Sequence, residues 1–393
     1  MDIELIREDT VGCTDKIFLN SAGSSLMPKI VVDKMIAYLK EEEENSGYEV
    51  ARLRANEIDE FYPEIAKLIN CDARNIAFAY NATDAYAKAL SSIPFKKDDF
   101  ILTTNDDYVS NQIAFLSLQK RFGIKIIRSD NLENGDIDLN NFEELIKLHQ
   151  PLLVSLTHIP TNSGLVQNAE AVGKICKKYD ILYLLDACQS IGQLVVDVKK
   201  IECDFLSATG RKFLRGPRGT GFLYVSDKAL DMGLEPLFID MRGADWINTN
   251  EYKIQSSAKR FELWELNCAS LIGLAEAVRY ANNIGLENIY EYNQTLIKKL
   301  RENCSQIAGL KLLDLGIELS NILTFRIDGF ERNEIEEALR NANVVFSVSG
   351  KENAFIDFDK KGIDWAIRFS PHYFNTLEEI ERVTEIVKGM RNK

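Results

Sequence analysis

The stretch "SATGRKFLRGPRGTGFLYV", residues 207–225, decides how the rest of this sequence is interpreted. Two apolar segments, which we interpret as strands, flank a loop that holds Lys212, three arginines and three glycines. An unpaired ammonium between two buried strands would cost free energy. Lys212 is therefore either an ordinary loop lysine or a lysine that the fold positions for chemistry. The residues around it decide between these two interpretations.

Short apolar segments alternate with amphipathic segments from about residue 60 to residue 225. This alternation predicts an α/β fold, with a mainly parallel sheet that helices cover on both faces. The expected strands span residues 75–80, 100–105, 124–129, 151–159, 180–187 and 203–209. The expected helices between them span residues 83–93, 110–122, 140–148 and 168–179.

The pattern changes beyond about residue 262, where long helices become common. We predict a large domain over residues 45–262 and a smaller α+β domain over residues 263–393. We expect residues 1–44 to pack on the small domain and on the active site. The small domain's expected elements are helices at 270–285, 289–307, 332–342 and 376–391 and strands at 320–328 and 365–370. Because no flexible linker separates the two domains, they should pack closely.

Composition excludes several classes of partner. The chain has 47 basic and 60 acidic residues, a net charge of −13, whereas proteins that bind the phosphate backbone of nucleic acids need clustered positive charge. The seven cysteines show no metal-type spacing. The sequence contains neither a secretory leader pattern nor an apolar run of membrane length. We therefore expect a soluble cytoplasmic protein that binds no nucleic acid, membrane or metal.

Several polar residues follow predicted strands, where open α/β sheets bind their ligands. Asp186 ends one apolar strand, and Lys212 follows the next. A helix that starts near Ala82 and Thr83 favours an anion. The pattern suits a ligand with a phosphate, a ring that needs a carboxylate, and a carbonyl that a lysine captures. Pyridoxal phosphate meets all three demands.

Each of these features also has a plainer explanation when taken alone. Asp186 could cap a helix or form a salt bridge, and "NAT" at 81–83 could be an ordinary helix cap. The segment "GPRGTG" could be a glycine turn, and it lacks the lysine and hydroxyl residue that end a Walker loop. The order of the features on successive strands favours the cofactor site.

Several blocks of the sequence are similar to those of one enzyme family in content, order and spacing. They are "FLNSAGSSLMP" (18–28), "LLDACQSIGQ" (184–193), residues 207–225, "KRFELWELNCASLIGLAEAV" (259–278) and "IRFSPHYFNTLEEIERV" (367–383). From about residue 15 onward the chain resembles the class V aminotransferases, which are fold type I pyridoxal phosphate enzymes. It resembles the cysteine desulfurases and, more closely, the isopenicillin-epimerase-like enzymes and ergothioneine-pathway C–S lyases. The resemblance implies a seven-stranded, mainly parallel sheet domain.

The resemblance also assigns roles around the cofactor. Lys212 would form the Schiff base and later act as acid and base at the substrate α-carbon. Asp186 would pair with the pyridinium nitrogen, and Gln189 would reach the phenolic oxygen. Tyr108 would stack on the ring, where the family usually has a histidine. The residues expected to hold the phosphate are Ala82, Thr83, Thr209 and Arg211.

The substrate should lie beside Arg368, which interrupts the apolar strand "WAIRFS". Its planar fork suits a carboxylate, and the alternative is a salt bridge between the domains. Asn162 should lie near the cofactor oxygen or the substrate carboxylate, with Thr161 as the alternative register. His158 and His372 could each be structural or line the site. Also expected to line the substrate pocket are Asn20, Ser21 and Ala22.

The resemblance further implies a homodimer with shared active sites. The family places the block at 260–267 against the partner's cofactor phosphate, and Trp264 and Asn267 are the expected contacts across the interface. If this block were merely core, charged side chains such as Arg260 and Glu262 would lack an obvious role.

The reaction depends on one departure from the desulfurase pattern. Desulfurases carry a nucleophilic cysteine on a loop shortly before the substrate arginine, and residues 343–367 contain none. Cys304 lies in a predicted helix, where an inert thiol is expected. We therefore expect a C–S lyase that acts on a cysteine conjugate or sulfoxide by β-elimination and gives pyruvate and ammonia. A class V aminotransferase, an amino-acid epimerase and a non-catalytic relative that binds the cofactor remain as alternatives.

Overall fold

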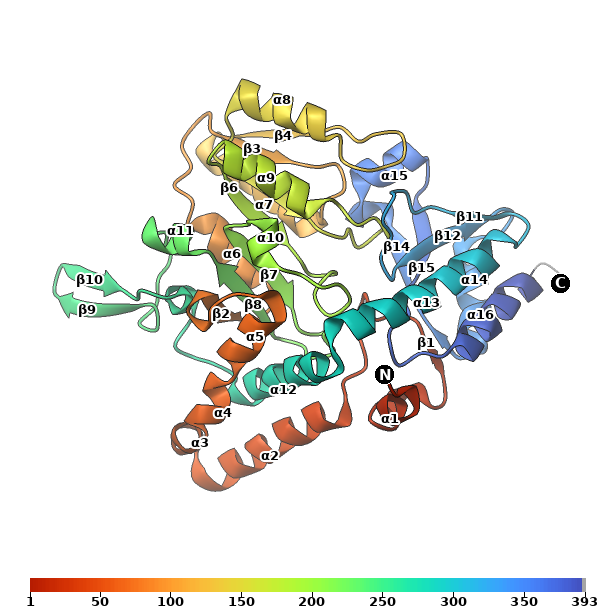
Figure 1. Cartoon of the computed structure of the whole chain (residues 1–393), viewed down its shortest axis with the longest axis horizontal. Helices are drawn as coiled ribbons and strands as arrows, with labels where there is room; N and C mark the ends of the chain where they lie inside the picture. The colour runs from red at the N-terminus through yellow and green to blue at the C-terminus, as the bar shows by residue number, and fades with distance from the viewer. Residues whose placement is uncertain (391–393) are drawn as a thin grey trace.

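The computed structural model of the chain describes residues 1–390 and is built around one large sheet (Figure 1). Its seven strands lie in the order β2-β8-β7-β6-β5-β3-β4. Strand β8 is antiparallel to both of its neighbours, and the other pairs are parallel. The strands are β2 (Ile76–Ala79), β3 (Phe100–Thr103), β4 (Lys125–Arg128), β5 (Leu153–Thr157), β6 (Leu182–Asp186), β7 (Phe205–Thr209) and β8 (Gly221–Val225). The predicted fold class is confirmed.

The four helices expected between the strands are present. Every residue of β5, β6 and β7 is buried, which explains why these strands are continuous apolar runs in the sequence. The helices are α6 (Ala82–Ser91), α7 (Val109–Phe122), α8 (Leu139–His149) and α9 (Ala169–Lys178), followed by the short α10 (Val198–Ile201) and α11 (Asp227–Asp231). Single turns of 3₁₀-helix occur at Val11–Cys13, Ala73–Asn75, Ala258–Phe261 and Lys351–Asn353.

A second, antiparallel sheet forms in the C-terminal part, with the strand order β11-β12-β15-β14. Its strands are β11 (Leu310–Leu312), β12 (Leu323–Ile327), β14 (Ser347–Gly350) and β15 (Trp365–Phe369). Its helices are α13 (Leu286–Ser305), α14 (Arg332–Asn341), α15 (Phe355–Lys361) and α16 (Leu377–Gly389). The N-terminal segment joins this part, because β1 (Ile17–Phe18), which follows α1 (Ile3–Glu8), pairs with β13 (Val344–Val345).

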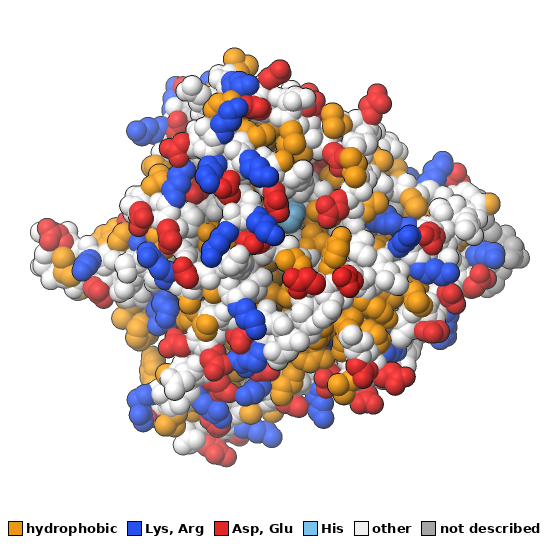
Figure 2. Space-filling model, in the orientation of Figure 1, with side chains coloured by type: hydrophobic (Ala, Val, Ile, Leu, Met, Phe, Trp, Pro, Cys, Tyr) orange, Lys and Arg blue, Asp and Glu red, His pale blue; other side chains and the backbone are white. Residues whose placement is uncertain are grey.

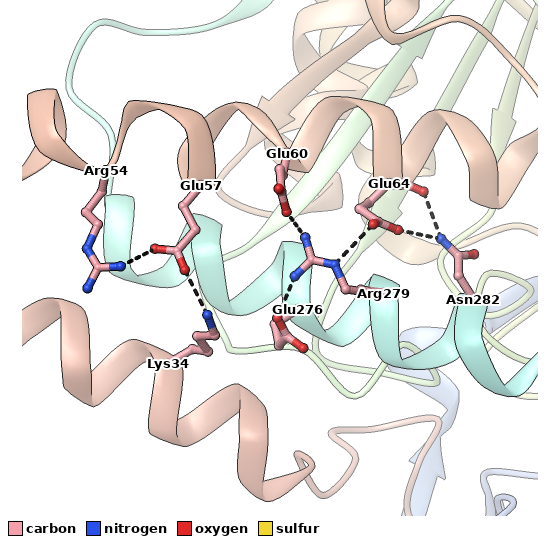
Figure 3. Close-up of polar contacts among 8 residues, drawn as sticks. All are labelled: Lys34, Arg54, Glu57, Glu60, Glu64, Glu276, Arg279 and Asn282. Carbon is pink, nitrogen blue, oxygen red and sulfur yellow. Dashed lines mark hydrogen bonds and ion pairs between the residues drawn. The ribbon is translucent and has the colours of Figure 1, made fainter.

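A layer of helices covers the lower side of the large sheet in Figure 1. It contains α2 (Lys29–Asn45), α3 (Gly47–Leu53), α4 (Ala55–Asp59), α5 (Phe61–Ile69) and α12 (Cys268–Ile284). Figure 3 shows the ion pairs on its surface, where Arg279 on α12 reaches Glu60 and Glu64, and Glu57 reaches Lys34. Helix α12 shares an apolar core with α5 and the sheet. The boundary at residue 262 stays a prediction.

One hairpin is absent from the sequence-based expectations. Strands β9 (Ala244–Asn248) and β10 (Glu251–Ile254) pair with each other and project from the left of the molecule in Figure 1. Trp246 is 80% exposed, and most side chains of both strands face solvent. Neither strand buries one complete face against the rest of the described chain.

Charged side chains of both signs are interspersed over the face drawn in Figure 2. Within residues 1–390, no helix has the length and apolar character needed to cross a membrane. The same residues contain no group of three or more histidine, cysteine, aspartate or glutamate side chains arranged to hold a metal ion.

Candidate active site

The glycines of residues 207–225 allow backbones to approach closely. A Cβ on Gly210 would lie 2.4 Å from the Thr220 hydroxyl oxygen. A Cβ on Gly221 would lie 2.4 Å from the carbonyl oxygen of Ala208 and 3.2 Å from the backbone nitrogen of Ala82. Glycine therefore lets β8 pack directly against the start of α6. The loop folds tightly between the two strands and leaves Lys212 at the carboxyl end of β7.

The three arginines of this loop have different surroundings. Arg215 is fully buried, and its guanidinium stacks on the Phe374 ring at 4.8 Å and donates to the Leu26 carbonyl. It is a structural anchor for the N-terminal segment. Arg218 is exposed at the edge of a cavity. Arg211 lines the same cavity and donates from Nη1 to the Gly23 carbonyl at 2.6 Å.

The cavity lies at the carboxyl ends of β5, β6 and β7 and has a volume of about 280 Å³. Most of the residues that the sequence assigned to the cofactor line it, although they come from four separate segments. They are Ala82, Thr83, Tyr108, Asp186, Gln189, Thr209, Arg211 and Lys212.

Lys212 is nearly buried, and its Nζ lies 6.0 Å from the centre of the Tyr108 ring. Burial lowers the pKa of its ammonium group, an effect that Asp186 partly offsets. Among residues 1–390, no carboxylate lies within ion-pair distance of Lys212. This lowering of the pKa shifts the equilibrium towards the neutral amine, which is the nucleophilic form.

Asp186 ends β6 and is 4% exposed. Its carboxylate accepts hydrogen bonds from Asn111 Nδ2 and from the backbone N–H of Cys188, both at 3.0 Å. Asp107 in turn accepts a hydrogen bond from Asn111 Nδ2 at 3.0 Å and so holds this amide in place. Asn111 and Asp107 were not predicted from the sequence, where their only signal is their position three residues after and one residue before Tyr108.

Gln189 lies on a turn after β6, and its Nε2 donates to the Ala22 carbonyl and to the Thr161 hydroxyl, both at 3.1 Å. Its Oε1 is buried and accepts no hydrogen bond from the described residues. An orphaned buried acceptor of this kind is costly unless a ligand satisfies it. Gln189 thus connects the cavity to the N-terminal segment.

The structure corrects the position of Asn162. Thr161 lines the cavity, whereas the Asn162 side chain points away and donates to Asp357 on α15 at 2.7 Å. The side chains of Thr161 and Asn162 point in opposite directions. An alignment error of one residue therefore assigns the cavity position to the side chain that points away from it. Thr161 therefore occupies the place that was expected for Asn162.

Arg368 on β15 is 7% exposed. Its Nη1 donates to the backbone and side-chain oxygens of Thr161 at 2.8 and 2.7 Å, and its Nη2 lies 3.5 Å from Asn20 Oδ1. Its Nε is buried without a partner among the described residues. Burial lowers the pKa of Arg368 to about 10, and Arg211 contributes to the decrease. No described carboxylate forms the alternative salt bridge.

The predicted N-terminal residues lie beside these groups rather than on the cavity wall. Ala22 accepts from Gln189, and its backbone N–H donates to the Ser370 hydroxyl at 3.0 Å. The Ser21 hydroxyl is buried 3.1 Å from that of Ser25. Ala22 therefore holds Gln189 and the residue after β15 in place through its backbone, and the Ser21 side chain is buried next to it.

Trp264 and Asn267 lie away from this cavity. Asn267 Oδ1 caps α12 by accepting from the backbone of Ser270 at 2.9 Å, while the Trp264 side chain is half exposed. The expectation that the charges of this block lack a role within the chain is wrong. Glu262 accepts from Tyr62 and pairs with Arg242, and Arg260 donates to three backbone carbonyls.

Cys188 is a cavity residue that the sequence analysis did not single out. Burial, followed by the Asp186 charge, raises the pKa of its thiol. Cys304 is buried in α13, as expected.

The histidines do not reach the cavity wall. The His372 ring contacts the Phe213 carbonyl at 2.7 Å and is structural. His158 is buried, and burial lowers its pKa to about 4.

Comparison with known proteins places this geometry in context. The family model described as "Aminotransferase class-V" matches residues 17–383. The "Probable cysteine desulfurase" of Methanothermobacter thermautotrophicus is 29% identical over 99% of this chain and 98% of that protein. The apo structure of the cysteine desulfurase from Thermococcus onnurineus NA1 has a TM-score of 0.90 and 27% identity, over 99% of this chain and 98% of that one. A cystine C–S lyase, C-DES, shares the fold, with a TM-score of 0.86 and 21% identity over 96% of this chain and 99% of that one.

Proposed function

The chain belongs to the class V aminotransferase family, and on this premise we propose that it is a carbon–sulfur lyase that releases pyruvate and ammonia from a cysteine conjugate or sulfoxide. Enzymes of this family depend on pyridoxal 5′-phosphate, which is the cofactor of this protein. The observation that supports the lyase best is the composition of the cavity. Among residues 1–390, the amine of Lys212 in this cavity has no carboxylate as an ion-pair partner, and the segment before Arg368 supplies no cysteine.

The cavity residues fit the cofactor on three counts. The Asp186 carboxylate is buried without an ion pair to any described cation, so it suits a protonated ring nitrogen. The unsatisfied Oε1 of Gln189 offers a partner to a ring substituent. The first N–H groups of α6, at Ala82 and Thr83, have no acceptor within the helix and suit a phosphate.

Each residue then has a defined task in the proposed reaction. When bound, the cofactor supplies an electron sink that stabilises negative charge at the substrate α-carbon. Asp186 holds the positive charge of the ring nitrogen, and the Tyr108 ring packs on the ring face. Thr209, at the end of β7, joins Ala82 and Thr83 at the phosphate.

Lys212 moves the proton in this proposal. Burial lowers the pKa of Lys212 and so favours the neutral amine, which would hold the cofactor's carbonyl and would accept the proton from the substrate α-carbon. The electron pair of that C–H bond becomes a double bond to the β-carbon, and the C–S electron pair leaves with the sulfur. Hydrolysis of the remaining three-carbon unit gives pyruvate and ammonia. Arg368 orients the substrate by binding its α-carboxylate.

A cysteine desulfurase is the second candidate, which the names of the relatives and the position of Cys188 favour. Desulfuration needs a thiolate that accepts sulfur. Residues 343–367 form β13, β14, a 3₁₀ turn and α15 and contain no cysteine, and the raised pKa of Cys188 disfavours its thiolate. The lyase needs no protein thiol and is therefore preferred.

We also propose that the protein works as a cytoplasmic homodimer. A second cavity of about 500 Å³ borders α2, α3 and α4, and Trp264 is among the residues that line it. Trp246 and Tyr48, 80% and 77% exposed, present further aromatic surface. Exposed aromatic groups of this kind are typical of interfaces. All seven cysteines are free, which suits a reducing compartment. Sedimentation at assay concentration tests the dimer, and a fully active monomer would contradict it.

One experiment separates the candidate reactions. The purified holoenzyme is incubated with cysteine, cysteine conjugates, cysteine sulfoxides and other amino acids, and pyruvate, ammonia, keto acids and racemised products are measured. The lyase gives equal amounts of pyruvate and ammonia, an aminotransferase gives keto acids, and an epimerase gives racemised product. A non-catalytic relative gives none of these.

A cysteine variant completes the test. We expect Cys188→Ala to retain lyase turnover, with Cys304→Ala as the matched buried-thiol control. A trappable persulfide on any cysteine, together with alanine as product, would overturn the lyase in favour of desulfuration.

A further inference from the structure

Asp107 is a second buried carboxylate near the cofactor site, and one amide group joins it to Asp186. Asn111 Nδ2 donates a hydrogen bond to Asp107 Oδ1 and another to Asp186 Oδ2, both at 3.0 Å. An amide nitrogen has two protons, and its two shortest contacts here are these carboxylates. Asp186 lines the cavity, whereas Asp107 does not. Asp107 therefore lies one side chain behind the carboxylate that suits the ring nitrogen.

The contacts of Asp107 are not those of a helix cap, although this residue precedes α7. A capping side chain accepts from the backbone N–H groups of the first helical turn. Asp107 accepts instead from four side chains and from the backbone N–H of Tyr108, the last at 2.7 Å. The side-chain donors, at 2.5–3.0 Å, are Thr103 Oγ1, Thr157 Oγ1, Asn111 Nδ2 and Gln112 Nε2. Because five donors surround one carboxylate, the contacts favour its ionised form.

No described cation neutralises either carboxylate. Within residues 1–390, neither Asp107 nor Asp186 has a lysine or arginine within ion-pair distance. Burial raises the pKa of Asp107, and the hydrogen bonds from its neighbours oppose the increase. The titratable groups whose charges act on the pair are Arg128 on β4, Tyr86 on α6, Cys188 and Lys212. Two buried carboxylates joined by one amide are costly unless a positive charge from outside the chain offsets them.

We propose that Asp107 acts with Asp186, through Asn111, to hold a proton on the cofactor's ring nitrogen. Asp186 accepts the ring N–H, and Asp107 adds a second negative charge behind it. Neither Asp107 nor Asn111 lines the cavity, so both are positioning residues that act through Asp186. The inference concerns the cofactor site and does not depend on which reaction the protein catalyses.

A competition between two cofactors measures the charge that the site offers to the ring nitrogen. The holoenzyme is incubated at about pH 8 with an equal, excess mixture of pyridoxal 5′-phosphate and its 1-deaza analogue, in which a C–H group replaces the ring nitrogen. Once the bound ratio is constant, borohydride fixes both compounds to Lys212, and peptide mass spectrometry measures the ratio. Loss of a nearby negative charge weakens the binding of the protonated ring alone. A general loosening of the fold weakens both compounds equally and leaves the ratio unchanged.

The wild type should retain pyridoxal 5′-phosphate in preference to the analogue. We expect Asp107→Asn, which keeps the shape of the side chain and removes its charge, to reduce this preference by about fivefold or more. Asn111→Leu should cause a similar loss, because two carboxylates without a donor between them share one proton. The double variant should lose no more than the larger single loss, since groups that act together are not additive.

Asp106→Asn is the matched control. It removes a neighbouring buried acid that accepts from Asn131 instead, and it should keep the wild-type ratio. Three results would overturn the proposal: a wild-type ratio in Asp107→Asn, an equal loss in Asp106→Asn, or single losses that multiply in the double variant. If Asp107→Asn does not fold, Asn111→Leu decides, and a wild-type ratio in that variant overturns the proposal. Failure of the lyase would appear as missing pyruvate in the product assay and would leave these ratios unchanged.

Discussion

An arginine in the helix layer and an arginine near the cavity differ in their ion pairs and in their exposure to solvent. Arg279 on α12 is 28% exposed and pairs with three carboxylates, those of Glu60, Glu64 and Glu276 (Figure 3). Arg368 is 7% exposed and pairs with none among residues 1–390. Arg279 is accessible to water and nevertheless forms ion pairs with carboxylates. Arg368 is shielded from water, and its guanidinium contacts only uncharged oxygen atoms.

This difference in ion pairing distinguishes a cation that stabilises the fold from a cation that binds a ligand. Removing a cation from water without a counter-charge costs several kcal/mol. A fold tolerates this where an anion from outside completes the site, and such groups cluster at functional sites. Arg279 is satisfied before any ligand arrives, whereas Lys212, Arg211 and Arg368 are not.

Replacing Lys212 should have the largest effect. We expect Lys212→Ala to lose turnover by about 10²–10⁴-fold or more, because it removes the group proposed to take the α-proton. Borohydride should fix the cofactor to the Lys212 peptide in the wild type and leave the variant unlabelled, which peptide mass spectrometry measures. A wild-type protein that is colourless with added pyridoxal phosphate and gains no mass on reduction would contradict the assignment.

Asp106 is a buried acid that forms no ion pair with any described cation, so the same comparison applies to it. Burial, followed by the Asp357 charge, raises the pKa of Asp106 from 3.8 to about 6. Between these two pH values the folded state binds more protons than the unfolded state, so the stability falls as the pH rises from about 4 to about 6, and the full penalty remains at higher pH. Asp106→Asn should therefore raise the free energy of unfolding by up to about 3 kcal/mol at pH 8 and by about half as much at pH 5.

Denaturant titration at the two pH values measures this change. Asp33→Asn removes an exposed carboxylate and serves as the control, with an expected change within about 0.5 kcal/mol. A stabilisation by Asp106→Asn that is the same at both pH values would refute the role of its raised pKa.

Arg368→Lys preserves the charge and removes the planar fork. We expect catalytic efficiency to fall at least about tenfold, since a charge-assisted hydrogen bond contributes roughly 1.5–3 kcal/mol. The cofactor content, measured by absorbance, should remain that of the wild type. Full activity in this variant would show that Arg368 does not bind the substrate carboxylate. Its role would then be the structural contact with Thr161.

Arg279→Met should give the smallest effect and only on stability. The free energy of unfolding should fall by about 1 kcal/mol, and less at high salt, because ion pairs near the surface contribute little and are screened. Steady-state kinetics should be unchanged. An effect on kcat/KM comparable to that of Arg368→Lys would break the distinction between the two kinds of arginine.

Part of the site could be predicted because it depends on short-range sequence features. Asp186 and Lys212 end two successive buried strands, and parallel neighbours bring their carboxyl ends to the same edge of the sheet. The glycines around Lys212 indicate close backbone approach. Cys188 was missed because an isolated cysteine in an apolar block has the pattern of a core residue.

The sequence by itself determined the succession of strands and helices, the family blocks and the residues at the strand ends, because all of these follow from local periodicity and spacing. The tertiary structure alone decided that Thr161 rather than Asn162 enters the cavity and that Arg211 turns towards Gly23. Arg368 meets Thr161 across 207 positions of sequence. Contacts of this kind depend on how the two larger sheets and the N-terminal segment pack against one another, and no local pattern encodes the direction in which a side chain on a turn will point.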